Sequence, residues 1–196
     1  MPNTNTEYER QKQKKAAREA EMSRTRRKKV FKKVGYWIAG LAVLIGGVWL
    51  LVVLVSNAGP KGPDYSQVIP VLGRNHIPDG STASYNSSPP TSGDHYANPA
   101  LARFYDKELP DEQIVHNLEH GHVWIAYKPG LSQETIKALR KLSGGNVITA
   151  PRSKNDTDIA LAAWGRLDKF NLENGRLDAE RVKDFISRYQ NKGPEK

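Results

Sequence analysis

The chain has 196 residues, a formal net charge of +9 and no cysteine. The lack of cysteine excludes disulfides, cysteine acylation, cysteine-ligated zinc and thiol catalysis. The charge is unevenly placed, because residues 1–33 hold 12 basic and 4 acidic side chains, whereas the chain after residue 55 holds 18 basic and 17 acidic ones. Nearly all of the excess positive charge therefore belongs to an N-terminal arm.

Residues 34–55 follow this basic arm and contain no charged side chain. A helix that crosses a bilayer needs about 20 apolar residues, and this run is long enough. Basic flanks stay in the cytoplasm, so we expect a single-pass protein with its N-terminus inside and its C-terminal domain outside the cell membrane. The arm, residues 1–33, then lies beside anionic lipid. A membrane partner is therefore favoured over nucleic acid for its Lys/Arg cluster.

A cleaved signal peptide is the alternative interpretation of the apolar run. Ser56 and Ala58 fit a cleavage site, but signal peptides have shorter apolar cores of about 7–15 residues. The sequence therefore favours an uncleaved signal anchor. Residues 6–29 have no apolar stripe, and we expect this part of the arm to be frayed or disordered in isolation.

The chain after the apolar run reads as a linker and one outer domain. Residues 56–64 are the Pro- and Gly-rich linker, and residues 65–192 are the domain. Residues 65–110 predict an irregular lobe, rich in Pro and Gly, with one brief strand near 68–72. The later patterns predict helices at 111–119, 133–142 and 179–189, and strands at 122–127, 146–150 and 159–167. This order indicates an α+β fold in which two helices cover one face of one small sheet.

All five histidines fall between residues 76 and 122. On the helix predicted at 111–119, His116 and His120 are four residues apart on one face, and Glu119 lies beside His116. Such a stack can hold a metal ion. The sequence of residues 116–120 also matches the H-x-x-E-H pattern of one zinc-protease class. In those enzymes the helix continues, whereas Gly121 should break it here. In an extended segment, His120 and His122 would instead share a face, so His120 is the strongest single candidate ligand.

A second motif, Pro89-Pro90-Thr91-Ser92-Gly93-Asp94-His95, reads as a stiff loop that presents His95. We expect this loop to pack against the segment from His116 to His120. Together the two motifs resemble domain-of-unknown-function family 3105, a family of uncharacterised bacterial membrane-anchored proteins. The resemblance covers roughly residues 65–190. Asp94 and His122 depart from the family pattern, where Pro and Gly are usual.

The resemblance implies that a set of residues occupies the family's signature positions, and that His76 falls where such proteins often carry a histidine. The signature positions are Pro89, Pro90, Thr91, Ser92, Gly93, His95, His116, Asn117, Glu119, His120 and Gly121. The family has no established activity, so the resemblance names no reaction.

The leading interpretation is an extracytoplasmic module that binds a divalent transition metal, Zn²⁺ or Cu²⁺, and the pattern favours binding over catalysis. Imidazole suits these ions, and the lack of sulfur ligands argues against Cu(I). The expected ligands are His95, His116 and His120, with Glu119 in direct or supporting contact and His76 or His122 auxiliary. The second interpretation is a structural or assembly protein of the cell envelope, in which the same residues form a hydrogen-bonded polar core. A metal-dependent hydrolase comes third.

Overall fold

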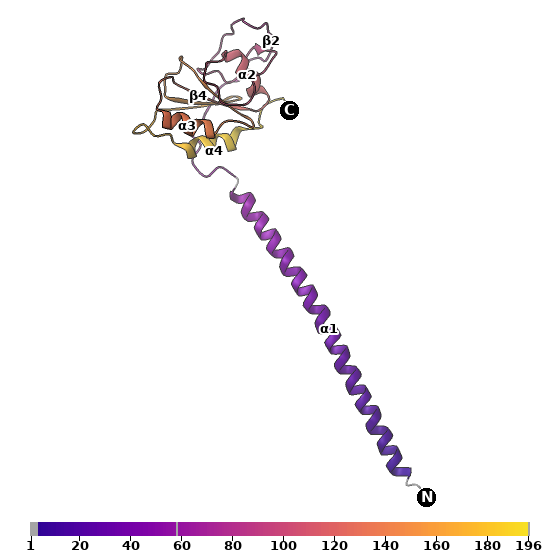
Figure 1. The fold of residues 1–196 in the computed structure, drawn as a ribbon. Helices are drawn as coiled ribbons and strands as arrows, with labels where there is room; N and C mark the ends of the chain where they lie inside the picture. Colours follow the sequence, from indigo (N-terminus) through magenta and orange to yellow (C-terminus); the bar gives the residue numbers. More distant parts are fainter. Residues whose placement is uncertain (1–3, 58, 196) are drawn as a thin grey trace. The chain divides into compact units, whose positions relative to one another are not determined.

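A computed structural model describes residues 4–57 and 59–195 of the chain, which divides into two compact units at the junction of Asn57 and Ala58. The first unit is one helix, α1 (Thr4–Asn57), shown in Figure 1. Its segment Phe31–Val53 has a mean hydropathy of 2.2, long and apolar enough to cross a membrane. This confirms the N-terminal apolar helix predicted from the sequence.

The helix also continues through the basic arm, where we expected frayed structure. The arm is rich in Glu, Gln, Lys, Arg and Ala, which all have high helix propensity. Extending a helix that already exists costs far less than nucleating a new one. The uncharged run therefore provides a nucleus from which the arm continues as helix.

The second unit is built on a five-stranded mixed sheet with the strand order β1-β7-β6-β4-β5. The strands are β1 (Gln67–Val68), β4 (Val123–Tyr127), β5 (Val147–Pro151), β6 (Ile159–Ala163) and β7 (Arg166–Phe170). Only β4 and β5 pair in parallel, and the other neighbours are antiparallel. The central strands are buried along their whole length, so each of their faces packs against a separate layer.

Two helices, α3 (Gln133–Lys141) and α4 (Ala179–Tyr189), cover one face of this sheet. Leu139 of α3 and Val182 and Phe185 of α4 pack there against alternate residues of the central strands, such as Ile125 and Leu161. In Figure 1 the two helices lie beside each other on the same side of the strands. The predicted α+β fold with two helices on one face is therefore confirmed.

The opposite face carries the third helix of this unit, α2 (Asp111–Glu119), together with the irregular lobe. Ile114 and Leu118 of α2 pack against Trp124 of the sheet, and Ala100 of the lobe joins the same cluster. The lobe has one small element of its own, in which β2 (His76–Ile77) pairs in parallel with β3 (His95–Tyr96). His76 and His95 therefore belong to the lobe, and His116 belongs to α2.

Two parts of the prediction differ from the structure. The strand predicted at 159–167 is two strands, β6 and β7, which form an antiparallel hairpin. Gly165 turns the chain with φ of +67°. The preceding residue, Trp164, packs against the core, so the sequence stays apolar up to the turn and hides it. The brief strand predicted at 68–72 begins and ends earlier, at Gln67–Val68, because only those two residues pair with β7.

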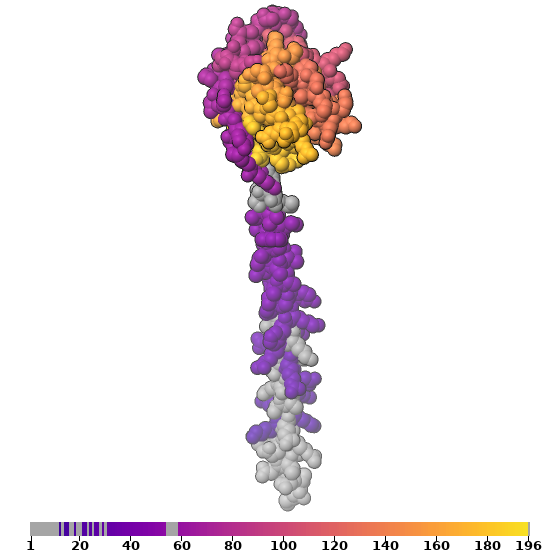
Figure 2. All heavy atoms as spheres, turned by 90° about the vertical axis from the view of Figure 1, so that its left-hand side faces the viewer, coloured from indigo at the N-terminus to yellow at the C-terminus, as the bar shows by residue number. Residues whose placement is uncertain are grey.

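Part of the stretch expected to be a linker is attached to the domain. The backbone N–H of Lys61 donates to Asp184 of α4 at 2.9 Å, and the Tyr189 hydroxyl donates to Asp64. Figure 2 shows this purple segment alongside the yellow C-terminal part of the chain. The ordered domain therefore starts a few residues before Tyr65.

Candidate metal centre

Helix α2 supplies two buried side chains, His116 and Glu119, from its last turn. Asp111 and Glu112 in the first turn suit the positive end of the helix dipole. The helix stops at His120 because Gly121 adopts φ of +79°, a left-handed conformation that favours glycine. The local sequence therefore places the end of α2 directly after the two candidate ligands.

The lobe supplies the other two candidate ligands through its short parallel pair of strands. His76 and His95 are direct Cα partners in the register of β2 and β3, and the N–H of His95 donates to the carbonyl of Asn75 at 3.0 Å. Gly93 enters β3 with φ of +125°, and a Cβ there would lie 2.9 Å from a ring carbon of Tyr85. This loop therefore needs glycine both for its backbone and for the close approach of Tyr85.

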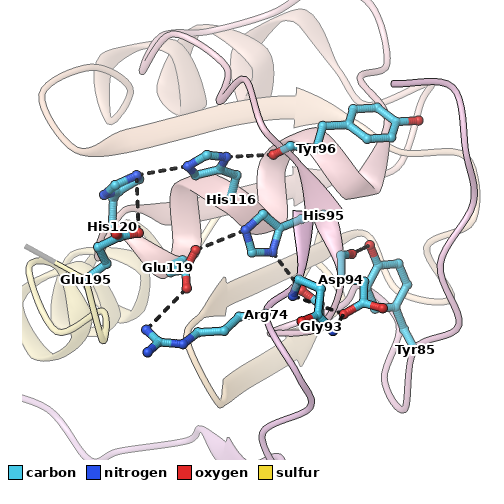
Figure 3. A network of polar contacts seen from close by, with 11 residues as sticks. Arg74, Tyr85, Gly93, Asp94, His95, Tyr96, His116, Glu119, His120 and Glu195 are labelled. Carbon is cyan, nitrogen blue, oxygen red and sulfur yellow. Dashed lines mark hydrogen bonds and ion pairs between the residues drawn. The ribbon is translucent and has the colours of Figure 1, made fainter. Parts of the chain in front are cut away.

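Four side chains converge between the lobe and α2. One ligand atom from each of His76, His95, His116 and Glu119 lies within 4.8 Å of the other three. The ring centroid of His95 is 5.2 Å from that of His76 and 4.9 Å from that of His116. The group is buried except for His76, which is exposed. The expected packing of the Pro89–His95 loop against α2 is thus present, and Figure 3 shows the contacts around His95 and His116.

Backbone carbonyls fix the orientation of the two buried rings. The Nδ1 atom of His95 lies 2.7 Å from the carbonyl oxygen of Gly93, and the Nδ1 atom of His116 lies 2.6 Å from that of Tyr96. A carbonyl oxygen only accepts, so both Nδ1 atoms carry a proton and, in a neutral ring, both Nε2 atoms keep a lone pair. A backbone carbonyl on the remote ring nitrogen is the usual support of a metal-ligating histidine.

The Nε2 atom of His95 lies 3.0 Å from Oε2 of Glu119, and both atoms are buried. Their contact lacks the geometry of a hydrogen bond, and the Nε2 atom has no hydrogen-bond partner among the residues that the structure describes. Two acceptor atoms at this distance repel each other unless a proton or a cation lies between them. Burial also lowers the pKa of His116 below its ordinary value, which favours the neutral ring that metal binding requires.

His120 and His122 lie outside the group of four. The rings of His120 and His116 stack with centroids 4.9 Å apart, as the helical spacing indicated, and their Nε2 atoms are 3.0 Å apart. The side chain of His120 is 38% exposed. The ring of His122 instead contacts the amide of Asn117, with 3.3 Å between Nδ1 and Nδ2. Burial lowers the pKa of His122.

Three further residues at the site were missed by sequence reasoning or given no defined task. The guanidinium of Arg74 lies 3.4 Å from Oε1 of Glu119, and its side chain is 57% exposed. Glu195 reaches the same region, with Oε2 3.9 Å from Nε2 of His120. The Asn117 side chain both accepts from and donates to the backbone of Ala100, each bond at 2.8 Å. Only Asn117 had a signal, its place between His116 and Glu119.

Comparison with known proteins gives one match. Residues 76–196 match the family described as "Protein of unknown function (DUF3105)". No curated protein and no solved structure matches the chain. The matched region begins at His76 and includes all four convergent side chains. Because the match covers more than half of the sequence, the chain belongs to the DUF3105 family.

Proposed function

We propose that the domain binds a divalent transition metal through His76, His95, His116 and Glu119. The observation that carries the proposal is the contact between His95 Nε2 and Glu119 Oε2, two buried atoms 3.0 Å apart. The hydrogen bond from His95 Nδ1 to Gly93 leaves the lone pair of Nε2 available to a metal. A cation between the two atoms turns a repulsion into two coordinate bonds.

The ligand set indicates which ions suit the site. Three imidazole nitrogens and one carboxylate oxygen, without sulfur, favour Zn²⁺ or Cu²⁺. Zinc–nitrogen bonds of 2.0–2.1 Å imply ligand separations of about 3.4 Å in a tetrahedron. The ligand atoms lie within 4.8 Å of one another, so metal binding shortens any of their separations by at most about 1.4 Å. Exposed His76 has the freedom for that movement.

We infer that α1 anchors this domain in a membrane with the domain outside the cytoplasm. The support is the apolar segment Phe31–Val53, which carries no charge after Lys33, and the net positive charge of residues 1–33. The test is protease added to spheroplasts that produce the chain with an N-terminal tag. The domain should be digested while the tag stays protected, and a protected domain would contradict the orientation.

A structural polar core is the second candidate, and the same atoms favour it. A proton on His95 Nε2 would make the contact with Glu119 a buried ion pair, which Arg74 extends toward the surface. In that arrangement the site ties the lobe to α2 and needs no metal. The two candidates differ in whether purified protein contains metal and gains stability from it.

The experiment is elemental analysis and thermal unfolding of the full chain, purified in detergent without a histidine tag. We expect bound metal, and a higher Tm with Zn²⁺ or Cu²⁺ than with chelator. His76→Ala should lose most of the metal but keep the chelator Tm, because exposed surface positions typically change stability by within about 0.5 kcal/mol. His122→Ala is the control that removes a neighbouring imidazole and should retain the metal. A wild-type chain that neither contains metal nor responds to it would leave the structural core as the function.

A further inference from the structure

The buried position of the ligands raises the question of how an ion reaches them. His95 is fully buried, His116 is 5% exposed and Glu119 is 3% exposed. A hydrated ion exchanges its waters for protein ligands one at a time. Entry is therefore helped by a ligand that is exposed to water and also lies next to the buried ligands. His120 has this placement, because its ring is partly exposed and its Nε2 atom lies 3.0 Å from that of His116.

His116 has one nitrogen available for a metal, and that atom can serve both the inner group of ligands and His120. Its Nδ1 atom is used by the carbonyl of Tyr96, which leaves Nε2. His116 contributes one nitrogen to the convergent group, and Nε2 is the one free to bind a metal there; it also touches Nε2 of His120. His116 is therefore a ligand common to an inner position and an outer one. An ion that moves between them can remain bound to His116 throughout.

The C-terminal segment places a carboxylate beside the outer histidine. Asn191 donates its N–H to the carbonyl of Gly121 at 2.7 Å, and Glu195 donates its N–H to the carbonyl of Glu119 at 3.2 Å. These bonds hold the segment along the end of α2, where Oε2 of Glu195 lies 3.9 Å from Nε2 of His120. Figure 3 shows Glu195, His120 and His116 in sequence. A carboxylate and an imidazole are both ordinary zinc ligands.

We propose that His120 and Glu195 form an outer capture position, which takes a divalent transition metal from solution and passes it to the inner site through His116. The inference rests on the proposed function of the inner site. Loading exchanges His120 and Glu195 for the inner ligands while the His116 bond is kept. No redox change is involved. In the metal-free ring pair, His120 Nε2 carries the proton that faces His116; water takes this proton as Nε2 binds the ion and returns one to Nδ1, so the ring stays neutral.

A capture ligand and a ligand of the final site have different kinetic signatures. A capture ligand lowers the free-energy barrier that the metal crosses both on loading and on release. Its removal therefore slows loading and release by the same factor and leaves Kd unchanged. A ligand of the final site stabilises the bound state, so its removal accelerates release and raises Kd. Rates and equilibrium measured on the same variants therefore separate the two roles.

The test uses the full chain in detergent with Co²⁺, which takes nitrogen and oxygen ligands as zinc does and absorbs visible light. Stopped-flow absorbance gives the loading rate, chelator challenge gives the release rate, and competition with Zn²⁺ gives relative affinity. His120→Ala should slow loading and release by about tenfold with Kd within about twofold. Glu195→Gln should also slow loading, by up to about tenfold, because it removes a negative charge that attracts the cation.

Two controls match these substitutions. His122→Ala removes an imidazole that lies outside both positions, and Glu134→Gln removes an exposed carboxylate in the first turn of α3, on the opposite face of the sheet. Both should load at the wild-type rate. Three results would overturn the capture position and leave the inner site standing. They are unchanged rates in His120→Ala, a raised Kd in that variant, and equal slowing in the controls. Failure of the wild-type chain to bind either Co²⁺ or Zn²⁺ would instead remove the proposed function.

Discussion

Glu119→Gln tests the chemistry of the site through the stability of the metal-free protein. The substitution keeps the size of the side chain and replaces one acceptor oxygen with an N–H donor. If His95 is neutral, the new amide can turn its N–H toward the Nε2 lone pair, and a repulsive contact becomes a hydrogen bond. If His95 is protonated, the substitution removes the carboxylate from an ion pair. The two cases change the free energy of unfolding in opposite directions.

The magnitudes follow from the 3.0 Å contact and from burial. A new buried hydrogen bond adds about 0.5–1.5 kcal/mol, whereas loss of a hydrogen bond to a charged group costs about 1.5–3 kcal/mol. The contact with Arg74 changes little, because its guanidinium is more than half exposed and the amide oxygen remains in reach. For a domain of this size, 1 kcal/mol corresponds to about 4 °C in Tm. We therefore expect a rise of about 4 °C for the metal site and a fall of at least about 6 °C for the ion pair.

The assay is thermal unfolding in chelator, followed by near-ultraviolet circular dichroism, with metal affinity measured separately. Metal affinity should fall by at least about tenfold, since a ligand is lost. Glu112→Gln is the matched control: this carboxylate is in the same helix, is buried, and accepts from the N–H of Ala83 at 3.1 Å, a bond that an amide oxygen can keep. A fall in Tm for Glu119→Gln with unchanged metal affinity would refute the metal-site argument.

Two further predictions concern the end of α2 and acid sensitivity. Gly121→Ala should destabilise the domain by at least about 1 kcal/mol more than Gly130→Ala in urea denaturation. Both positions have positive φ, which costs about 1–2 kcal/mol in a residue with a Cβ, but only at Gly121 would that atom meet the Cα of Asn191, at 2.8 Å. The pKa values of His116 and His122 are held low by burial, so the unfolded chain binds protons that the native chain does not. Metal-free protein should keep its urea midpoint above pH 6.5 and lose stability as pH falls below about 6.5, and a flat profile would contradict this.

The helices that flank the site were predictable because their signals are local. The bounds of α2 and α4 agree with the predicted 111–119 and 179–189. Asp178 caps α4 by accepting the N–H of Arg181 at 2.9 Å, and Gly121 ends α2 through its left-handed backbone. Caps and stop signals of this kind lie within a few residues of the element that they define.

The hairpin and the lobe strands were not predictable to the same degree. Hydrophobic periodicity cannot divide 159–167 when Trp164 keeps the turn apolar, and the isolated Gly165 was the only local sign of a turn. A two-residue strand such as β2 has no period at all, and its partner β3 lies 19 residues away in sequence. Pairing of that kind depends on the whole lobe rather than on any local pattern.

The same distinction applies to the candidate site. The spacing of His116, Glu119 and His120 places them on one side of α2, which is a property of any helix. The spacing does not tell which member of the row faces the lobe. In the structure His116 and Glu119 face His95, whereas His120 faces the C-terminal segment. His76 lies in the group because β2 pairs with β3 in a register that sets it opposite His95, and the sequence spacing does not give this register.

The residues around the ligands explain why so much of the two motifs consists of groups that bind no metal. Asn117 pairs with both backbone groups of Ala100 and joins the lobe to α2, and Ser92 accepts the N–H of Leu72 at 2.9 Å within the lobe. Gly93 allows its carbonyl to reach His95 Nδ1. The carbonyls of Gly93 and Tyr96 thus orient two of the three rings without help from a metal. An ion would then join His76 and His95 of the lobe to His116 and Glu119 of α2 across a junction already in place. Binding to a preorganised group avoids the entropy cost of ordering it, so the affinity of the site depends on the scaffold as well as on the ligands.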